Sequence, residues 1–191
     1  MSIEGGLSIR PIMSGKSRPS REGAGGTQSS GLKSVRLYEL EVFLISGPVS
    51  ATFAKKNRVV SRTILIRDDQ TLEDLHHATF EAYGRWEEHA YEFQFGKGPM
   101  DPKGLSYVLP TAFEVGLGKG KRPAGRVDLT TIESLGLEVG RTFGYWFDFG
   151  DDWWHQINVM QIRDSVPAGH YPKIIKGQGE NPPQYQEKEE G

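Results

Sequence analysis

The chain has 191 residues, with 23 Lys and Arg against 25 Asp and Glu, a formal net charge of −2 and no cysteine. This length predicts one domain plus tails. The missing cysteine excludes disulfide scaffolds, thiol nucleophiles and Cys-ligated zinc or iron–sulfur sites. The charge balance argues against a dedicated high-charge DNA-binding protein. No apolar run approaches the ~20 residues of a membrane span, and no signal peptide opens the chain, so the expected location is cytoplasmic, without a membrane partner.

The two ends differ in composition from the middle. Residues 1–34 contain seven Gly, eight Ser, five basic and two acidic residues. This predicts a flexible, mildly basic arm, which is either an inert leader or an arm that touches phosphates. Residues 176–191 are rich in Gly, Pro, Gln and Glu and are expected to form an irregular tail. The folded domain is therefore predicted to span residues 35–175.

Two β-rich runs open this domain. Apolar residues alternate along Leu37–Ile45, which predicts a half-buried strand, and Val59–Arg67 is the second run. The segment 55–58 between them is expected to be a turn or a strand start. Thr71 then suits the N-cap of a helix whose apolar residues recur at helical spacing to Tyr83.

A short aromatic strand is expected at Tyr91–Phe95. Residues 99–125 are rich in Gly and Pro and predict a long excursion with one strand at Ser106–Val115. A short helix or turn follows at Thr130–Leu135. Strands at Thr142–Phe149 and Trp153–Ile162 are joined by Gly and Asp residues typical of a tight turn.

This order of elements predicts the α+β class. A hairpin leading into one main helix packed across a mixed sheet is a β-grasp-like arrangement, with flexible tails at both ends.

Three stretches together resemble a known family, the plasmid ORF-three-like family, also called the transposon-passenger TnpR-like family. They are Thr71–His76 followed by Gly84, Trp86, His89 and Phe93; the string Tyr145–His155; and Tyr171-Pro172 followed by Gly177, Gly179 and Pro182-Pro183. The resemblance covers roughly residues 35–183, and the middle string is the specific part. It implies an α+β fold and an association with mobile elements, but no established activity.

The chain departs from the family pattern at several positions. Ser61-Arg62-Thr63 stands where the family usually has Trp-Arg-Arg, and Gln184-Tyr185 stands in place of an acidic pair. Ala90-Tyr91 replaces a Leu-His pair, and the middle loop is basic where the family's is usually acidic.

The acidic string suggests a metal site. Asp148, Asp151, Asp152 and His155 lie within eight residues and would suit a divalent metal that generates hydroxide or holds a phosphate. The structural alternative is a hairpin turn anchored by Asp151 and Asp152, with His155 buried on the face of Trp153.

His76 and His89 would complete such a site if they converge with His155 on one rim. The alternative is that each histidine is buried and hydrogen-bonded in the ordinary way.

A basic loop and four tryptophans are candidates for binding. Gly116–Arg122 lacks the hydroxyl residue and the helix of a phosphate-binding loop, so a nucleotide fold is rejected. Lys119, Lys121, Arg122 and Arg126 form either a basic finger for nucleic-acid backbone or an acidic protein, or a solvated loop. Trp86, Trp146, Trp153 and Trp154 are expected to gather near the hairpin, with Trp153 and Trp154 on opposite faces.

Taken together, these features favour a non-enzymatic module that binds a protein or nucleic acid. The alternative is a metal-dependent hydrolase or nuclease centred on Asp148, Asp151, Asp152 and His155. A divalent metal is the one cofactor that this alternative requires.

Overall fold

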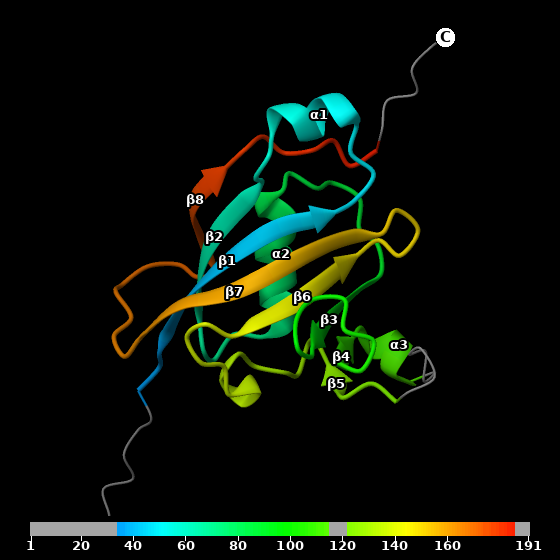
Figure 1. The fold of residues 1–191 in the computed structure, drawn as a ribbon. Helices are drawn as coiled ribbons and strands as arrows, with labels where there is room; N and C mark the ends of the chain where they lie inside the picture. Colours follow the sequence, from blue (N-terminus) through cyan, green and yellow to red (C-terminus); the bar gives the residue numbers. More distant parts are fainter. Residues whose placement is uncertain (1–33, 115–121, 186–191) are drawn as a thin grey trace, which may run out of the picture. The chain divides into compact units, whose positions relative to one another are not determined.

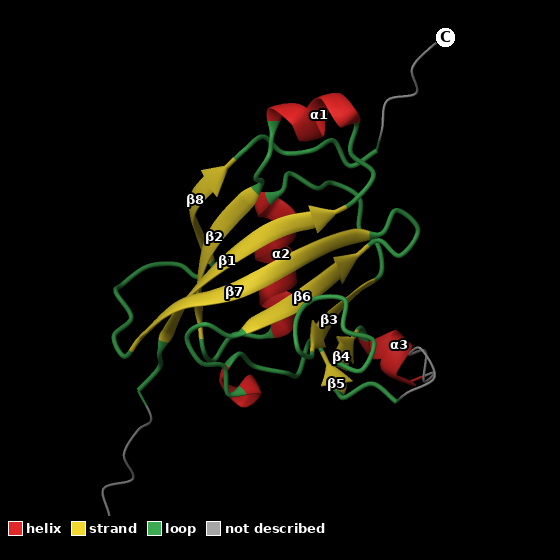
Figure 2. Ribbon diagram, viewed as in Figure 1, coloured by secondary structure: helices red, strands yellow, loops and turns green. Residues whose placement is uncertain are grey.

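The computed structural model describes residues 34–114 and 122–185, and Figure 1 shows the arrangement of their elements. These residues form an eight-stranded sheet in the order β5-β4-β3-β6-β7-β1-β2-β8. Its pairings are antiparallel except for β4 with β5, which is parallel. Helix α2 (Leu72–Ala82) crosses one face of the sheet (Figure 2). The predicted α+β class is therefore confirmed, whereas the β-grasp topology stays a prediction. The N-terminal arm, up to residue 33, lies outside the described residues.

The first two strands follow the sequence prediction. Strand β1 (Leu37–Ser46) pairs with β2 (Ser61–Arg67), and Tyr38, Leu40 and Val42 of β1 are buried. Between them lies helix α1 (Ala51–Lys56), where the sequence predicted a turn or strand start. This helix buries none of its residues, so the sequence has no apolar stripe that would predict it.

Helix α2 is held by local signals and by its buried face. Thr71 and Asp74 form a capping box, with Asp74 N–H donating to Thr71 Oγ1 at 3.2 Å and Thr71 N–H donating to Asp74 Oδ2 at 2.7 Å. Leu72 and Leu75 are fully buried on the face toward the sheet. Gly84 follows in the left-handed conformation, with φ of 62°.

The predicted excursion contains short elements. Strand β3 (Tyr91–Phe95) pairs with β4 (Leu105–Val108), after which the chain forms α3 (Pro110–Glu114) and β5 (Gly125–Arg126). The strand predicted at Ser106–Val115 thus ends early, because Pro110 begins a helix. A 3-10 turn, η1 (Glu133–Leu135), lies where a short helix or turn was expected.

The last part of the sheet is the hairpin of β6 (Thr142–Phe147) and β7 (Trp153–Arg163), followed by β8 (Lys173–Gln178). Strand β8 pairs with β2 and crosses the boundary predicted between domain and tail at residue 175. The prediction of an irregular tail from residue 176 is therefore corrected. Strand β8 is mostly exposed and lacks alternating apolar residues, so its position depends on backbone pairing.

The two faces of the sheet differ. One face packs against α2, and we call the opposite one the open face. Trp146 and Trp154 lie on the open face, together with Glu92 of β3, which pairs with Trp146 in register. Among the described helices, none combines the length and the apolar character needed to cross a membrane.

Candidate functional site

The β6–β7 hairpin sends its aromatic and polar side chains to both faces. Trp153 and His155 point toward α2 and are fully buried, with exposed fractions of 0% and 1%. Trp154 lies on the open face and stacks on Trp146, with ring centroids 4.9 Å apart. Trp153 and Trp154 therefore lie on opposite faces, as side-chain alternation in a strand requires.

Asp148 fixes the tip of this hairpin. It adopts a left-handed conformation, with φ of 53°, and its Oδ1 accepts hydrogen bonds from the N–H groups of Gly150 at 3.1 Å and Asp151 at 3.3 Å. Asp152 instead accepts a hydrogen bond from Trp154 Nε1 at 2.9 Å. The sequence had placed the anchoring role on Asp151 and Asp152. The structure gives it to Asp148, because that residue precedes the amides that need an acceptor.

His89 lies beside Asp148 at the surface. Its Nε2 is 3.6 Å from Asp148 Oδ2 and 2.7 Å from the Tyr185 hydroxyl. Tyr185 also donates a hydrogen bond to Glu87 at 3.0 Å. Desolvation and the Glu87 carboxylate raise the pKa of Tyr185 to about 12. This part of the C-terminal segment, which the sequence predicted to be irregular, thus completes the surroundings of His89.

The C-terminal segment also contacts the loop after α2. Gln184 Oε1 accepts hydrogen bonds from the N–H groups of Trp86 at 3.0 Å and Glu87 at 3.2 Å. Trp86 is 70% exposed, and its ring meets the Tyr185 ring edge-on at 5.6 Å. Tyr185 and Gln184 were not among the sequence candidates, and only their departure from the family's acidic pair pointed to them.

His155 occupies the space between the sheet and the end of α2. Burial, together with the charge of Arg85, lowers the pKa of His155 to about 3. Among the described residues, none makes a hydrogen bond of good geometry to the ring nitrogens of His155. A weak interaction with the Tyr145 backbone raises the pKa of His155, but by less than burial lowers it. The imidazole is therefore neutral at neutral pH and packs edge-on against Tyr83 at 4.8 Å.

Arg85 is a buried cation that the sequence did not single out. It is 7% exposed, and within the described part of the chain its guanidinium nitrogens have no hydrogen-bond partner. The guanidinium lies 3.7 Å from the centroid of the Trp153 ring, which is a close cation–π contact. Burial lowers the pKa of Arg85 to about 10, so the side chain is still charged at neutral pH.

His76 is buried on α2 and is bonded at both ring nitrogens. Nδ1 lies 2.8 Å from the Tyr145 hydroxyl, Nε2 lies 3.1 Å from Glu88 Oε2, and the ring stacks on Tyr91. Burial lowers the pKa of His76 to about 3. The contact with Glu88 is therefore a hydrogen bond from a neutral ring rather than an ion pair.

The six residues of the predicted acid and histidine cluster thus lie in different surroundings. Asp148 and His89 lie close together, Asp151 follows in the turn, Asp152 contacts Trp154, and His155 and His76 are buried with their own neighbours. In the part of the chain that is described, the group of three or more potential metal ligands within 4.8 Å of one another is His76, His77 and Glu88. His77 and Glu88 were missed because nothing in the sequence brings them together.

The open face carries a pocket of about 250 Å³ beside the hairpin. The stacked Trp146 and Trp154 line it, as do three acidic residues from different segments: Glu92, Asp101 and Asp152. The remaining lining residues are Gln94, Met100, Pro102, Gly104 and Ser106, so none of the described lining residues is basic.

Glu92 is the unusual member of this pocket. It is 7% exposed and accepts a hydrogen bond from Gln94 Nε2, but it has no ion pair with a described basic residue. Gln94 Oε1 is buried without a hydrogen-bond partner in the same part of the structure. The pocket therefore offers acceptors and negative charge beside an aromatic wall.

The predicted basic finger is described only in part. Lys119 and Lys121 lie outside the described residues. Arg122 is exposed, with its guanidinium 5.9 Å from the Phe113 ring centroid. Arg126 forms an ion pair with Asp128 at 2.6 Å, so its charge is partly neutralised.

Comparison with known proteins supplies a family but no activity. No curated protein matches the chain. Among solved structures it is similar to a protein of unknown function, MM3350 from Methanosarcina mazei Go1, with a TM-score of 0.54 and 18% identity over 75% of this chain and 70% of that one. At this identity the likeness shows the fold alone. The model of one family, the plasmid pRiA4b ORF-3-like proteins, matches residues 48–189, and the chain therefore belongs to that family.

Proposed function

We propose that the protein is a non-enzymatic binding module and that its open-face pocket binds a basic side chain of a partner protein. The observation that carries this proposal is the buried Glu92 carboxylate, which has no cationic partner among the described residues and lies beside Trp146 and Trp154. A buried carboxylate is costly unless it is paired, and a partner's cation would supply the pair.

The shape of the pocket favours one side chain over a larger ligand. Its volume of about 250 Å³ lies below the range of roughly 300–1,000 Å³ typical of small-molecule sites. Arginine is the best fit, because its planar guanidinium stacks on indole rings and donates several hydrogen bonds at once. These donors would reach the Glu92 carboxylate and the unpaired Gln94 Oε1.

The charge of the pocket argues against nucleic acid at this site. Among the described residues, three acidic side chains line it and no basic one does, whereas a nucleic-acid site needs positive charge for the phosphates. In the β-grasp-like arrangement predicted from the sequence, one helix covers only one face of the sheet. A binding pocket on the opposite, open face agrees with that prediction. A role in a mobile element stays a prediction.

The experiment uses a fluorescein-labelled peptide of alternating Gly and Arg and the same peptide with citrulline, a neutral isostere of arginine. Fluorescence anisotropy should show the arginine peptide binding at least tenfold more tightly to the wild-type chain. Glu92→Gln, which keeps the size of the side chain, should remove this preference. Glu138→Gln is the matched control, because Glu138 is exposed and outside the pocket.

Two outcomes would contradict the proposal. One is equal binding of the arginine and citrulline peptides. The other is tight binding of a single-stranded DNA oligonucleotide that Glu92→Gln leaves unchanged, which would favour the nucleic-acid alternative.

A further inference from the structure

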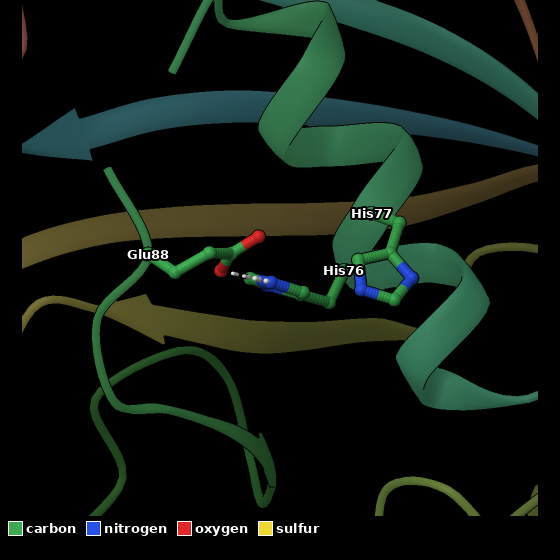
Figure 3. Close-up of side chains that lie close together, drawn as sticks. All are labelled: His76, His77 and Glu88. Atoms are coloured by element: carbon green, nitrogen blue, oxygen red, sulfur yellow. Dashed lines mark hydrogen bonds and ion pairs between the residues drawn. The ribbon is translucent and has the colours of Figure 1, made fainter. Parts of the chain in front are cut away.

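Three side chains that can bind a metal ion lie close together where helix α2 meets the segment that follows it. They are the buried His76 and the exposed His77 and Glu88. Figure 3 shows Glu88 reaching from the segment after α2 toward the His76 ring, with His77 beside it on the helix. One ligand atom from each residue lies within 4.8 Å of the other two. We propose that these three side chains bind a divalent transition-metal ion, with zinc as the preferred occupant.

The distances suit such an ion. Zinc bonds to His nitrogen and carboxylate oxygen are about 2.0–2.1 Å long, so tetrahedral ligand atoms lie about 3.3 Å apart. His76 Nε2 and Glu88 Oε2 are 3.1 Å apart, which is close to this spacing. His77 is exposed, and its ring centroid lies 5.2 Å from that of His76, so metal binding requires the His77 side chain to rotate toward the other two ligands.

The donor set favours zinc over harder cations. Two imidazoles and one carboxylate suit zinc and its neighbours in the first transition row, whereas calcium and magnesium prefer oxygen ligands. Three protein ligands with a fourth position left for water are the pattern of open zinc sites. Glu88 is 58% exposed, so solvent reaches this position.

The buried side of the site provides a second support. His76 Nδ1 is 2.8 Å from the Tyr145 hydroxyl, which can both donate and accept a hydrogen bond. Without metal, the hydroxyl donates to Nδ1 while Nε2–H donates to Glu88. With metal, Nδ1 carries the proton and donates to the hydroxyl, so that the Nε2 lone pair faces the ion. Tyr145 is therefore a positioning residue of the kind that commonly supports metal-bound histidines.

The test uses the full chain, free of any histidine tag and stripped with a chelator. Isothermal titration calorimetry with zinc should show one site per chain, and cobalt should give the intense visible bands of a four-coordinate ion. His77→Gln and Glu88→Gln should each weaken zinc binding at least tenfold. Both side chains are exposed, so neither change threatens the fold.

Two further variants sharpen the result. Tyr145→Phe should weaken zinc binding about 10- to 100-fold, as outer-shell changes do, with the cobalt bands retained at high metal concentration. His170→Gln is the matched control, because this histidine is exposed and lies on the loop before β8. The proposal is overturned if the wild type binds no more tightly than His77→Gln and Glu88→Gln, or if His170→Gln weakens binding as much as they do.

Discussion

Asp148 shows how one carboxylate can shape the hairpin that carries half of the residues predicted to be functional. Its Oδ1 accepts two backbone hydrogen bonds in the turn, while its Oδ2 faces His89. Replacing it with alanine leaves these amides without their acceptor. We expect Asp148→Ala to lower the free energy of unfolding by about 1–2 kcal/mol in urea denaturation.

Two controls accompany this variant. Asp148→Asn keeps an acceptor oxygen and tolerates the left-handed conformation, so it should retain most of the stability. Asp151→Ala should change the free energy of unfolding by less than about 0.5 kcal/mol, as surface changes usually do. If Asp151→Ala proved as costly as Asp148→Ala, the turn would depend on Asp151, as the sequence had suggested.

His155 makes stability depend on pH. Its pKa falls from 6.5 to about 3 on burial, while Arg85, Tyr83 and Tyr145 face it without changing charge in this range. Between these two values the unfolded chain binds a proton that the folded chain does not. Stability from this residue is therefore present above pH 6.5 and is lost as the pH falls. Between pH 7 and pH 5 the loss amounts to about 2 kcal/mol.

Urea unfolding at both pH values tests this prediction. His155→Leu, which has similar volume and no titrating group, should lose about 2 kcal/mol less than the wild type between pH 7 and pH 5. Equal losses in the two proteins would mean that His155 is already protonated or solvated in the folded state.

Trp153, the first residue of strand β7, packs against the connection between β1 and α1. A Cβ atom added to Gly47 would lie 2.2 Å from Cε3 of Trp153, which is fully buried. The Arg85 guanidinium also packs on the Trp153 ring, so the ring has little room to move away from an added Cβ atom. We expect Gly47→Ala to lower the free energy of unfolding by about 1–3 kcal/mol, the usual cost of overpacking.

Gly98→Ala, in the loop between β3 and β4, is the control for this substitution. A Cβ atom at Gly98 meets nothing within 4 Å, so the melting temperature should stay close to that of the wild type. If Gly98→Ala lost as much stability as Gly47→Ala, the loss would come from reduced backbone freedom at glycine rather than from a clash with Trp153.

Across the whole domain, Arg62 joins segments that are distant in the sequence. Its guanidinium donates hydrogen bonds to backbone carbonyls of Ser61, Ala82, Gln178 and Gly179 and to the Asn181 side chain. Strand β2, the end of α2 and the end of β8 therefore share one buried cation.

Lysine cannot replace this arrangement, since its single ammonium group has three donors and no planar fork. We expect Arg62→Lys to lower the free energy of unfolding by about 2–4 kcal/mol, because several carbonyls lose their donors. Hydrogen exchange should show the largest loss of protection in β8.

The exposed pair Lys56–Glu180 serves as the control for Arg62. Both side chains are largely exposed although their charged atoms are 2.7 Å apart. Glu180→Gln should leave the melting temperature close to that of the wild type, because an exposed ion pair contributes little to stability. If Glu180→Gln destabilised the protein as much as Arg62→Lys, the C-terminal segment would be held by the exposed ion pair rather than by the hydrogen bonds of Arg62.

Elements with local signals could be predicted from the amino-acid sequence. Alternation predicted β1, the capping residue Thr71 and the helical spacing predicted α2, and the Gly-Asp turn predicted the β6–β7 hairpin. The family resemblance was also carried by sequence strings, and the family match confirms it for the plasmid ORF-3-like part. Such signals survive without the fold, because a turn or a helix end is decided by residues a few positions apart.

The tertiary structure alone decided which side chains meet. Glu92, Trp146 and Trp154 belong to three strands, and the register of those strands places them in one pocket. Glu88 reaches His76 only because the chain turns back after α2. Strand β8 likewise depends on the backbone of β2. These contacts join residues that are distant in the sequence, and no local pattern encodes the pairing and packing that bring them together.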